Sequence, residues 1–167
     1  MIVSIYIVTH TSVDRDVCEA KIIGVCNILE VAAGMMQKCI YKQFESNKEW
    51  WEDEDDEQIV DVQYREWIDE NYIDDEHLIW IYTDECDEIE HRLQIHTVFF
   101  ELEAELRDVY VILHTCVDGV DNKTNLLGVF ASQKKAEEAL KSFDLVDNCE
   151  DSFVENIISI EKCTIEV

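Results

Sequence analysis

The sequence contains no proline and only four glycines among its 167 residues. It has no P-loop, no GxGxxG and no GxSxG motif, so neither a phosphate-cradling loop nor a nucleophile elbow is predicted. No run of about 18 apolar residues, the length that spans a membrane, is present. The first ten residues, MIVSIYIVTH, lack a basic region and a cleavage site, which predicts a buried strand and not a signal peptide.

Closely spaced cysteine pairs are also missing. None of the seven cysteines forms a CxxC pair, and a structural zinc site needs such neighbouring ligands. Cys26, Cys39 and Cys163 instead fall in apolar patterns. Without a secretion signal, this favours reduced thiols in a cytoplasm. Residues 45–90 contain no glycine for an EF-hand loop. We therefore predict no metal site and no cofactor.

Apolar residues and acids are abundant. Apolar residues make up 47 % of the chain, which is enough for a hydrophobic core, so the net charge of −26 does not indicate disorder. The length suits one domain, or two very small ones that share a core.

An internal repeat organises the sequence. Residues 5–14 (IYIVTHTSVD) resemble residues 109–118 (VYVILHTCVD), and the similarity continues without a gap past Gly24 and Gly128. Each copy has the pattern of two strands, a helix and a last strand. The predicted fold class is α+β: two tandem, pseudo-symmetric ββαβ repeats with an antiparallel sheet and packed helices. The first repeat covers residues 1–102, with an acidic insert at about 45–90, and the second covers 103–167.

The helices and last strands of the two copies have clear signals. Ser132 is a favourable N-cap for the second helix, and the first helix is predicted from about Leu29 to Phe44. The last strands are predicted at residues 93–102 and 157–167. Within the insert, the spacing of Val60, Tyr64 and Trp67 predicts a short helix, and residues 78–83 alternate as a strand.

The second copy resembles a known type of protein. Its strand with His114, followed by the stretch LLGVFASQKKAEEAL at residues 126–140, is similar to a small family of uncharacterised ββαβ proteins from phages and prophage-carrying bacteria. The resemblance covers about 60 residues of the second copy and is weak in the first, where Ile28, Glu30 and Val31 depart from it. It implies a fold but no catalytic residues.

The negative charge is concentrated in the insert. Residues 45–90 hold 20 acids and two bases, a net charge of −18, together with all four tryptophans. We predict that this segment forms a partner-binding surface with two tryptophans as apolar anchors. The predicted contact residues are Trp50, Trp51, Glu52, Asp53, Glu54, Asp55, Asp56, Glu57, Glu66, Asp69, Glu70, Asp74, Asp75 and Glu76.

The dense acids admit two interpretations. They can simply solvate an exposed face. Alternatively, carboxylates about 5–7 Å apart on helix turns or alternate strand positions resemble neighbouring phosphates, and such a surface can enter a channel built for DNA or RNA. Direct nucleic-acid binding is disfavoured because like charges repel.

His10 and His114 occupy equivalent positions, each four residues before an aspartate, Asp14 or Asp118. Such a pair can act as a general-base dyad, but duplication and backbone contacts explain it equally. His91 and His96 lie five residues apart on a predicted strand. They should therefore face opposite sides of the sheet and form no metal pair.

These observations favour binding over catalysis. The leading hypothesis is an acidic, phage-encoded inhibitor that mimics nucleic acid and binds a CRISPR effector or a restriction nuclease. The alternatives are a protein-interaction or antitoxin-like module without mimicry, and an enzyme that uses His10 and His114.

Overall fold

The structure is a computed structural model that describes residues 2–14, 17–47, 72–74, 79–84, 89–101, 107–117, 123–143 and 155–166. This part of the chain contains eight strands and two helices. In chain order they are β1 (Ile2–Asp14), β2 (Val17–Cys26), α1 (Leu29–Asn47), β3 (Tyr72–Asp74), β4 (Ile79–Asp84), β5 (Ile89–Glu101), β6 (Asp108–Val117), β7 (Lys123–Phe130), α3 (Gln133–Leu140) and β8 (Glu155–Glu166).

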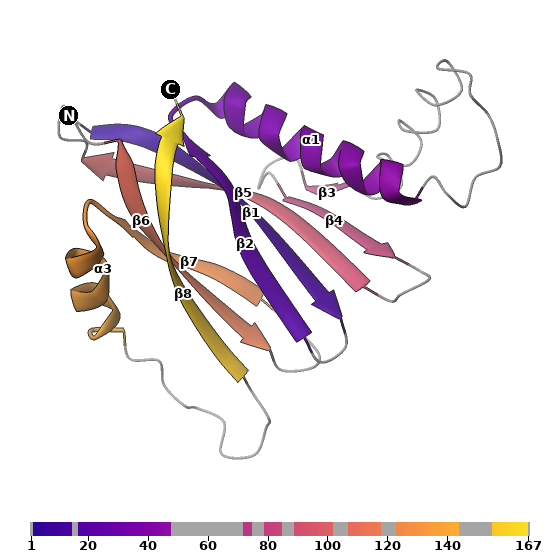
Figure 1. The fold of residues 1–167 in the computed structure, drawn as a ribbon. Helices are drawn as coiled ribbons and strands as arrows, with labels where there is room; N and C mark the ends of the chain where they lie inside the picture. Colours follow the sequence, from indigo (N-terminus) through magenta and orange to yellow (C-terminus); the bar gives the residue numbers. More distant parts are fainter. Residues whose placement is uncertain are drawn as a thin grey trace.

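The eight strands form one curled, mixed sheet. Their order across the sheet is β3-β4-β5-β1-β2-β8-β6-β7. All neighbours are antiparallel except β2 and β8, which pair in parallel where Val25 lies opposite Ile165 and Cys26 opposite Glu166. The sheet curls (Figure 1), so that residues of β1 and β2 pack against residues of β6.

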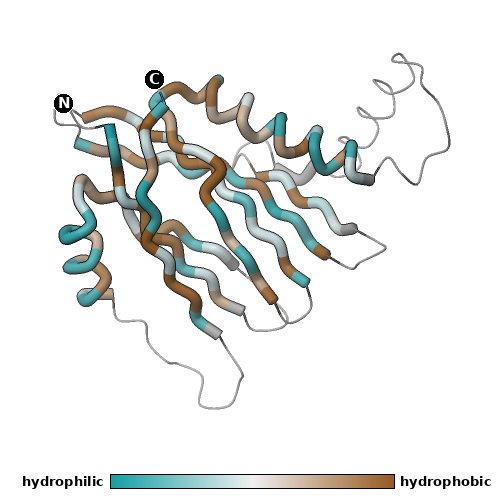
Figure 2. Tube along the Cα trace, in the orientation of Figure 1, coloured by the Kyte–Doolittle hydropathy of each residue, from teal (hydrophilic) through white to brown (hydrophobic). Residues whose placement is uncertain are grey.

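The bend gives the sheet an inner face and an outer face. Polar and apolar residues alternate along the strands (Figure 2). Successive side chains of a strand point to opposite faces of the sheet, so this alternation indicates that one face is more apolar than the other. On the inner face Ile5, Ile7 and Val25 pack against Val109 and Val111 from the other side of the bend. This shared inner core is built from both ends of the sequence.

The outer face is covered by the helices. The helix α1 lies across β1, β2 and β5, while α3 lies against β6, β7 and β8. Under α1, a second core contains Val8, Met36, Phe44, Trp80 and Leu93, among others. These residues come from the helix and from β1, β4 and β5, so α1 packs against the half of the sheet that contains these three strands.

The hairpins β1–β2 and β6–β7 have matching registers. Each has an irregularity in the ladder, between Val8 and Thr9 in one and between Ile112 and Leu113 in the other. Gly24, opposite the first, lets the Met35 side chain of α1 approach closely: a Cβ there would lie 2.6 Å from the Met35 sulfur, so that side chain would have to shift.

Several local predictions are confirmed. Ser132 caps α3, accepting a hydrogen bond from the backbone N–H of Lys135 at 3.3 Å. The helix predicted from Leu29 begins there and extends to Asn47. The two last strands and the strand at 78–83 occur as β5, β8 and β4. The short helix predicted at residues 60–68 lies outside the described residues.

The predicted fold class is wrong. The described chain is mostly β, with about two-thirds of its residues in strands and a quarter in helices, and not an α+β pair of repeats with an antiparallel sheet and packed helices. The parallel pairing of β2 with β8 joins all strands into one mixed sheet. The helices lie on separate parts of its outer surface. Sequence periodicity reports which face of a strand is buried, but it does not report which strand lies alongside.

Candidate functional site

The predicted acidic contact surface lies almost entirely outside the described residues. Of its members only Asp74 falls within them, in the backbone of β3. The structure does describe the two elements that flank this segment. Phe44, near the end of α1, is 3 % exposed, and Trp80, near the start of β4, is fully buried in the same core. The chain between Phe44 and Trp80 therefore starts and ends in the same core.

The negative charge is unevenly distributed along the chain. Residues 45–90 hold 20 acids and two bases, a net charge of −18, whereas the rest of the chain holds 19 acids and 11 bases, a net charge of −8. About two-thirds of the net charge therefore lies in the insert.

The strand histidines do not form the expected dyads in the described contacts. His10 Nε2 lies 3.1 Å from His91 Nδ1 and the two rings stack, with centroids 5.3 Å apart. The stack continues through Tyr82 to Trp80. His114 Nε2 lies 2.8 Å from Asn156 Oδ1 at an exposed position. Within the described contacts His10 pairs with His91 and not with Asp14, and Asp118, the aspartate suggested for His114, lies outside the described residues.

Burial lowers the pKa of His10 from 6.5 to about 4, and the neighbouring charges of Lys21 on β2 and His91 on β5 act in the same direction. Because the pKa of His10 is lower in the folded chain than in the unfolded chain, protonation below about pH 6.5 favours the unfolded state. The free energy of unfolding therefore decreases as the pH falls from about 6.5 toward 4. We expect His10 to contribute about 2 kcal/mol to this loss, after allowance for the partial exposure of the ring.

Urea unfolding of the wild type and His10→Gln at pH 7.5 and 4.5 measures this contribution. The loss of unfolding free energy on acidification should be smaller in the variant. Equal losses would mean that His10 is not the titrating group. The comparison cancels the general effect of protonating the many carboxylates, which both proteins share.

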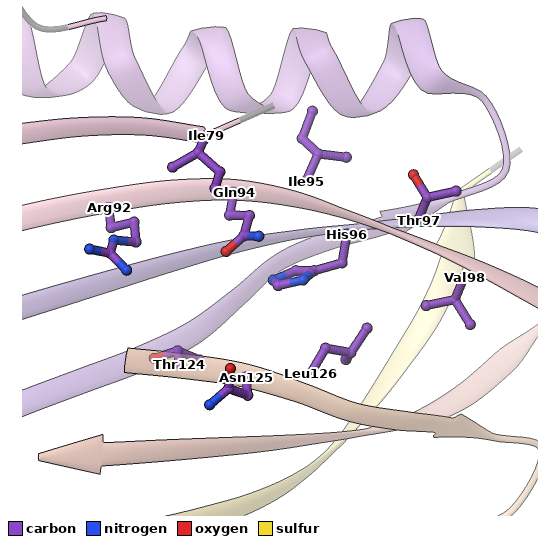
Figure 3. A pocket seen from close by; sticks show the side chains of 10 residues that line it. All are labelled: Ile79, Arg92, Gln94, Ile95, His96, Thr97, Val98, Thr124, Asn125 and Leu126. Atoms are coloured by element: carbon purple, nitrogen blue, oxygen red, sulfur yellow. The ribbon is translucent and has the colours of Figure 1, made fainter. Parts of the chain in front are cut away.

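A pocket of about 660 Å³ lies on the inner face between β5 and β7. Figure 3 shows the side chains of Arg92, Gln94 and His96 directed from β5 toward β7. Thr124 and Leu126 of β7 form the facing wall, and Val98 continues the β5 wall. The pocket is polar at its Arg92 end and becomes apolar at Val98 and Leu126, where the shared inner core begins.

Buried threonines hold the two walls together. Thr11 Oγ1 donates to Thr124 Oγ1 at 3.0 Å, and Thr115 Oγ1 lies 3.2 Å from the same oxygen. Thr9 Oγ1 lies 3.1 Å from His96 Nε2. Since Thr11 and Thr124 come from opposite sides of the bend, this hydrogen bond fixes the width of the polar end.

The pocket was missed from the sequence, although a signal was present. In β5, Arg92, Gln94 and His96 alternate with buried Leu93 and Ile95. Polar residues that alternate with apolar ones usually indicate a solvated face. Here the polar face looks into the bend of the sheet, which only the tertiary structure reveals. The prediction that His91 and His96 face opposite sides is confirmed, since His91 contacts His10 and His96 contacts Thr9.

Cysteines and other metal-ligating residues give no further site in the described ranges. The five cysteines described there are free thiols, and burial raises the pKa of Cys163 to about 11, which makes that thiol less reactive. Within the same ranges no three His, Cys, Asp or Glu residues are grouped as a metal site. Neither α1 nor α3, the described helices, has the length and apolar character to cross a membrane.

No protein-family model, curated protein or solved structure matches the chain. The resemblance to phage-type ββαβ proteins therefore stays a hypothesis.

Proposed function

We propose that the chain is an acidic inhibitor that binds a basic, nucleic-acid-handling protein through the segment between α1 and β4. The observation that carries this proposal is the concentration of charge: residues 45–90 bear a net charge of −18, while the rest of the chain bears −8. A dense acidic segment of this kind is attracted to the Lys- and Arg-lined channels that hold DNA or RNA.

The attachment of the segment supports this proposal. Phe44 and Trp80 are held in one core, so both ends of the acidic segment are anchored. Anchoring reduces the chain entropy that is lost when a segment is ordered on a partner. A CRISPR effector or a restriction nuclease in a bacterial cytoplasm fits the partner chemistry, and a phage origin follows from the resemblance of the second copy. The alternative is an interaction module whose acids only keep it in solution.

A salt-dependent binding experiment tests the proposal. The tagged protein is incubated with lysate of a bacterium that carries CRISPR and restriction systems, and the captured protein is purified for affinity measurements. We expect a nucleic-acid-binding protein whose affinity falls steeply when salt rises from about 50 to about 300 mM. Duplex DNA or RNA should compete for the same site.

Neutralising the acids separates mimicry from simple solvation. Changing Glu and Asp at positions 52–57 to Gln and Asn should weaken partner binding on the order of 100-fold, at a few tenths of a kcal/mol or more for each charge removed. The matched control changes six exposed glutamates of the scaffold, Glu19, Glu30, Glu101, Glu137, Glu138 and Glu166. Equal losses in the two variants, or a partner that resists salt and ignores nucleic acid, would contradict mimicry and favour the interaction module.

A further inference from the structure

The pocket between β5 and β7 has a charge character opposite to that of the chain. Among the described residues that line it, Arg92 is the single charged one and none is acidic, although acids outnumber bases 39 to 13 in the sequence. This described lining favours a ligand with one negative charge.

Arg92 has hydrogen-bonding capacity that the described residues do not satisfy. Its Nε is buried and has no hydrogen-bond partner among them. Its Nη2 lies 3.4 Å from Glu90 Oε1, in a pair whose side chains are 27 % and 39 % exposed, so this contact is weak. A buried donor without an acceptor is unfavourable, and a carboxylate is the acceptor whose planar geometry matches the guanidinium.

The neighbouring polar side chains suit a ligand that carries a single charge. Burial lowers the pKa of His96, so its ring is neutral at pH 7, and its Nε2 is already engaged by Thr9. His96 therefore adds hydrogen-bonding capacity without a second positive charge. A phosphate dianion would need more than one cation, and Glu90 beside Arg92 opposes it.

The other end of the pocket requires an apolar group. Val98 and Leu126 are partly buried and pack on the shared inner core. Leu126 lies two residues, about 7 Å of strand, from Thr124, and the Thr124 hydroxyl contacts Thr11, which pairs with Arg92. The tail of a ten-carbon acid whose carboxylate lies on Arg92 therefore reaches Leu126. The volume of about 660 Å³ lies within the range of small-molecule sites.

We propose that this pocket binds a small amphipathic carboxylate, with its carboxylate on Arg92 and its apolar tail against Leu126, directed toward Val98. The site is separate from the acidic segment, and it does not depend on the proposed inhibitory function. The hydrogen bond from Thr11, which pairs with Arg92 in the sheet, to Thr124 of β7 holds the two walls at a fixed spacing, so the pocket is formed before the ligand enters.

Calorimetric titration of the full chain with decanoate tests the proposal. We expect one saturable site with a dissociation constant on the order of 100 µM, and a shift of the Arg92 Nε–H signal in ¹⁵N–¹H NMR during the titration. Decanol, which has the same tail without the charge, should bind at least about 10-fold more weakly, since a charge-assisted hydrogen bond contributes about 1.5–3 kcal/mol. Acetate, which has only the head group, should not saturate the site.

Variants at two arginines make the result specific. Arg92→Met keeps the apolar stem and should weaken decanoate binding about 10- to 100-fold, while decanol binding stays unchanged. Arg107→Met removes one positive charge at an exposed position outside the pocket and should leave decanoate binding unchanged. Arg92→Lys, which keeps the charge without the planar fork, should bind with intermediate affinity, and it serves as the test if Arg92→Met does not fold. Equal binding of decanoate and decanol, or undiminished decanoate binding in both Arg92 variants, would overturn the proposal.

Discussion

Replacing Val111 by aspartate is expected to unfold the whole chain and not only its second half. Val111 is fully buried in the inner core, where it packs with Ile5, Ile7 and Val25 from the other side of the bend. An unpaired carboxylate at this position costs at least about 4–5 kcal/mol, a large part of the roughly 5–15 kcal/mol that stabilises a typical domain. Far-ultraviolet circular dichroism should therefore lose the helical signal of α1 together with the strand signal.

The matched control is Phe99→Asp, which makes the same kind of change on a strand. Phe99 is 77 % exposed, so its replacement should change the unfolding free energy by no more than about 0.5 kcal/mol. If Val111→Asp instead left a protein with an intact α1 signal and a cooperative thermal transition, residues 1–102 would fold on their own. The shared inner core would then not be required for the fold.

Replacing Trp80 by alanine should lower the unfolding free energy by about 4 kcal/mol. Trp80 is the largest fully buried side chain and lies in the outer core with Phe44 and Leu93. Its removal leaves a cavity between β4, β5 and α1, whose walls belong to a regular sheet and helix and cannot collapse fully. Denaturant unfolding at pH 7 gives the value directly.

A smaller change at the same position provides the control. Trp80→Phe keeps an aromatic ring in the outer core and should cost about 1–2 kcal/mol. A loss below about 1 kcal/mol for Trp80→Ala would show that the outer core closes around the missing ring. It would also weaken the view that the β4 end of the acidic segment is firmly anchored, on which part of the proposed function rests.

Local structure followed closely from the sequence. The alternation in residues 5–13 and 109–117 matches β1 and β6, and the Ser132 cap and the Leu29 helix start match α3 and α1. These features depend on interactions between residues close in sequence, such as a cap bonding to the third residue of its helix. The partners of His10 could not be predicted in this way, because His91 lies 81 residues away and reaches it only through the pairing of β1 with β5.

By itself, the sequence determined where strands and helices form, which of their faces are apolar, and where the negative charge is concentrated. The tertiary structure decided the pairing of β2 with β8, the bend that creates one shared inner core, and the meeting of Arg92 with Thr124 across a pocket. The reason is that hydrophobic periodicity indicates for each residue only whether its side chain is buried. The choice of strand neighbours instead depends on the total apolar area that each arrangement removes from water, which is a property of the whole chain.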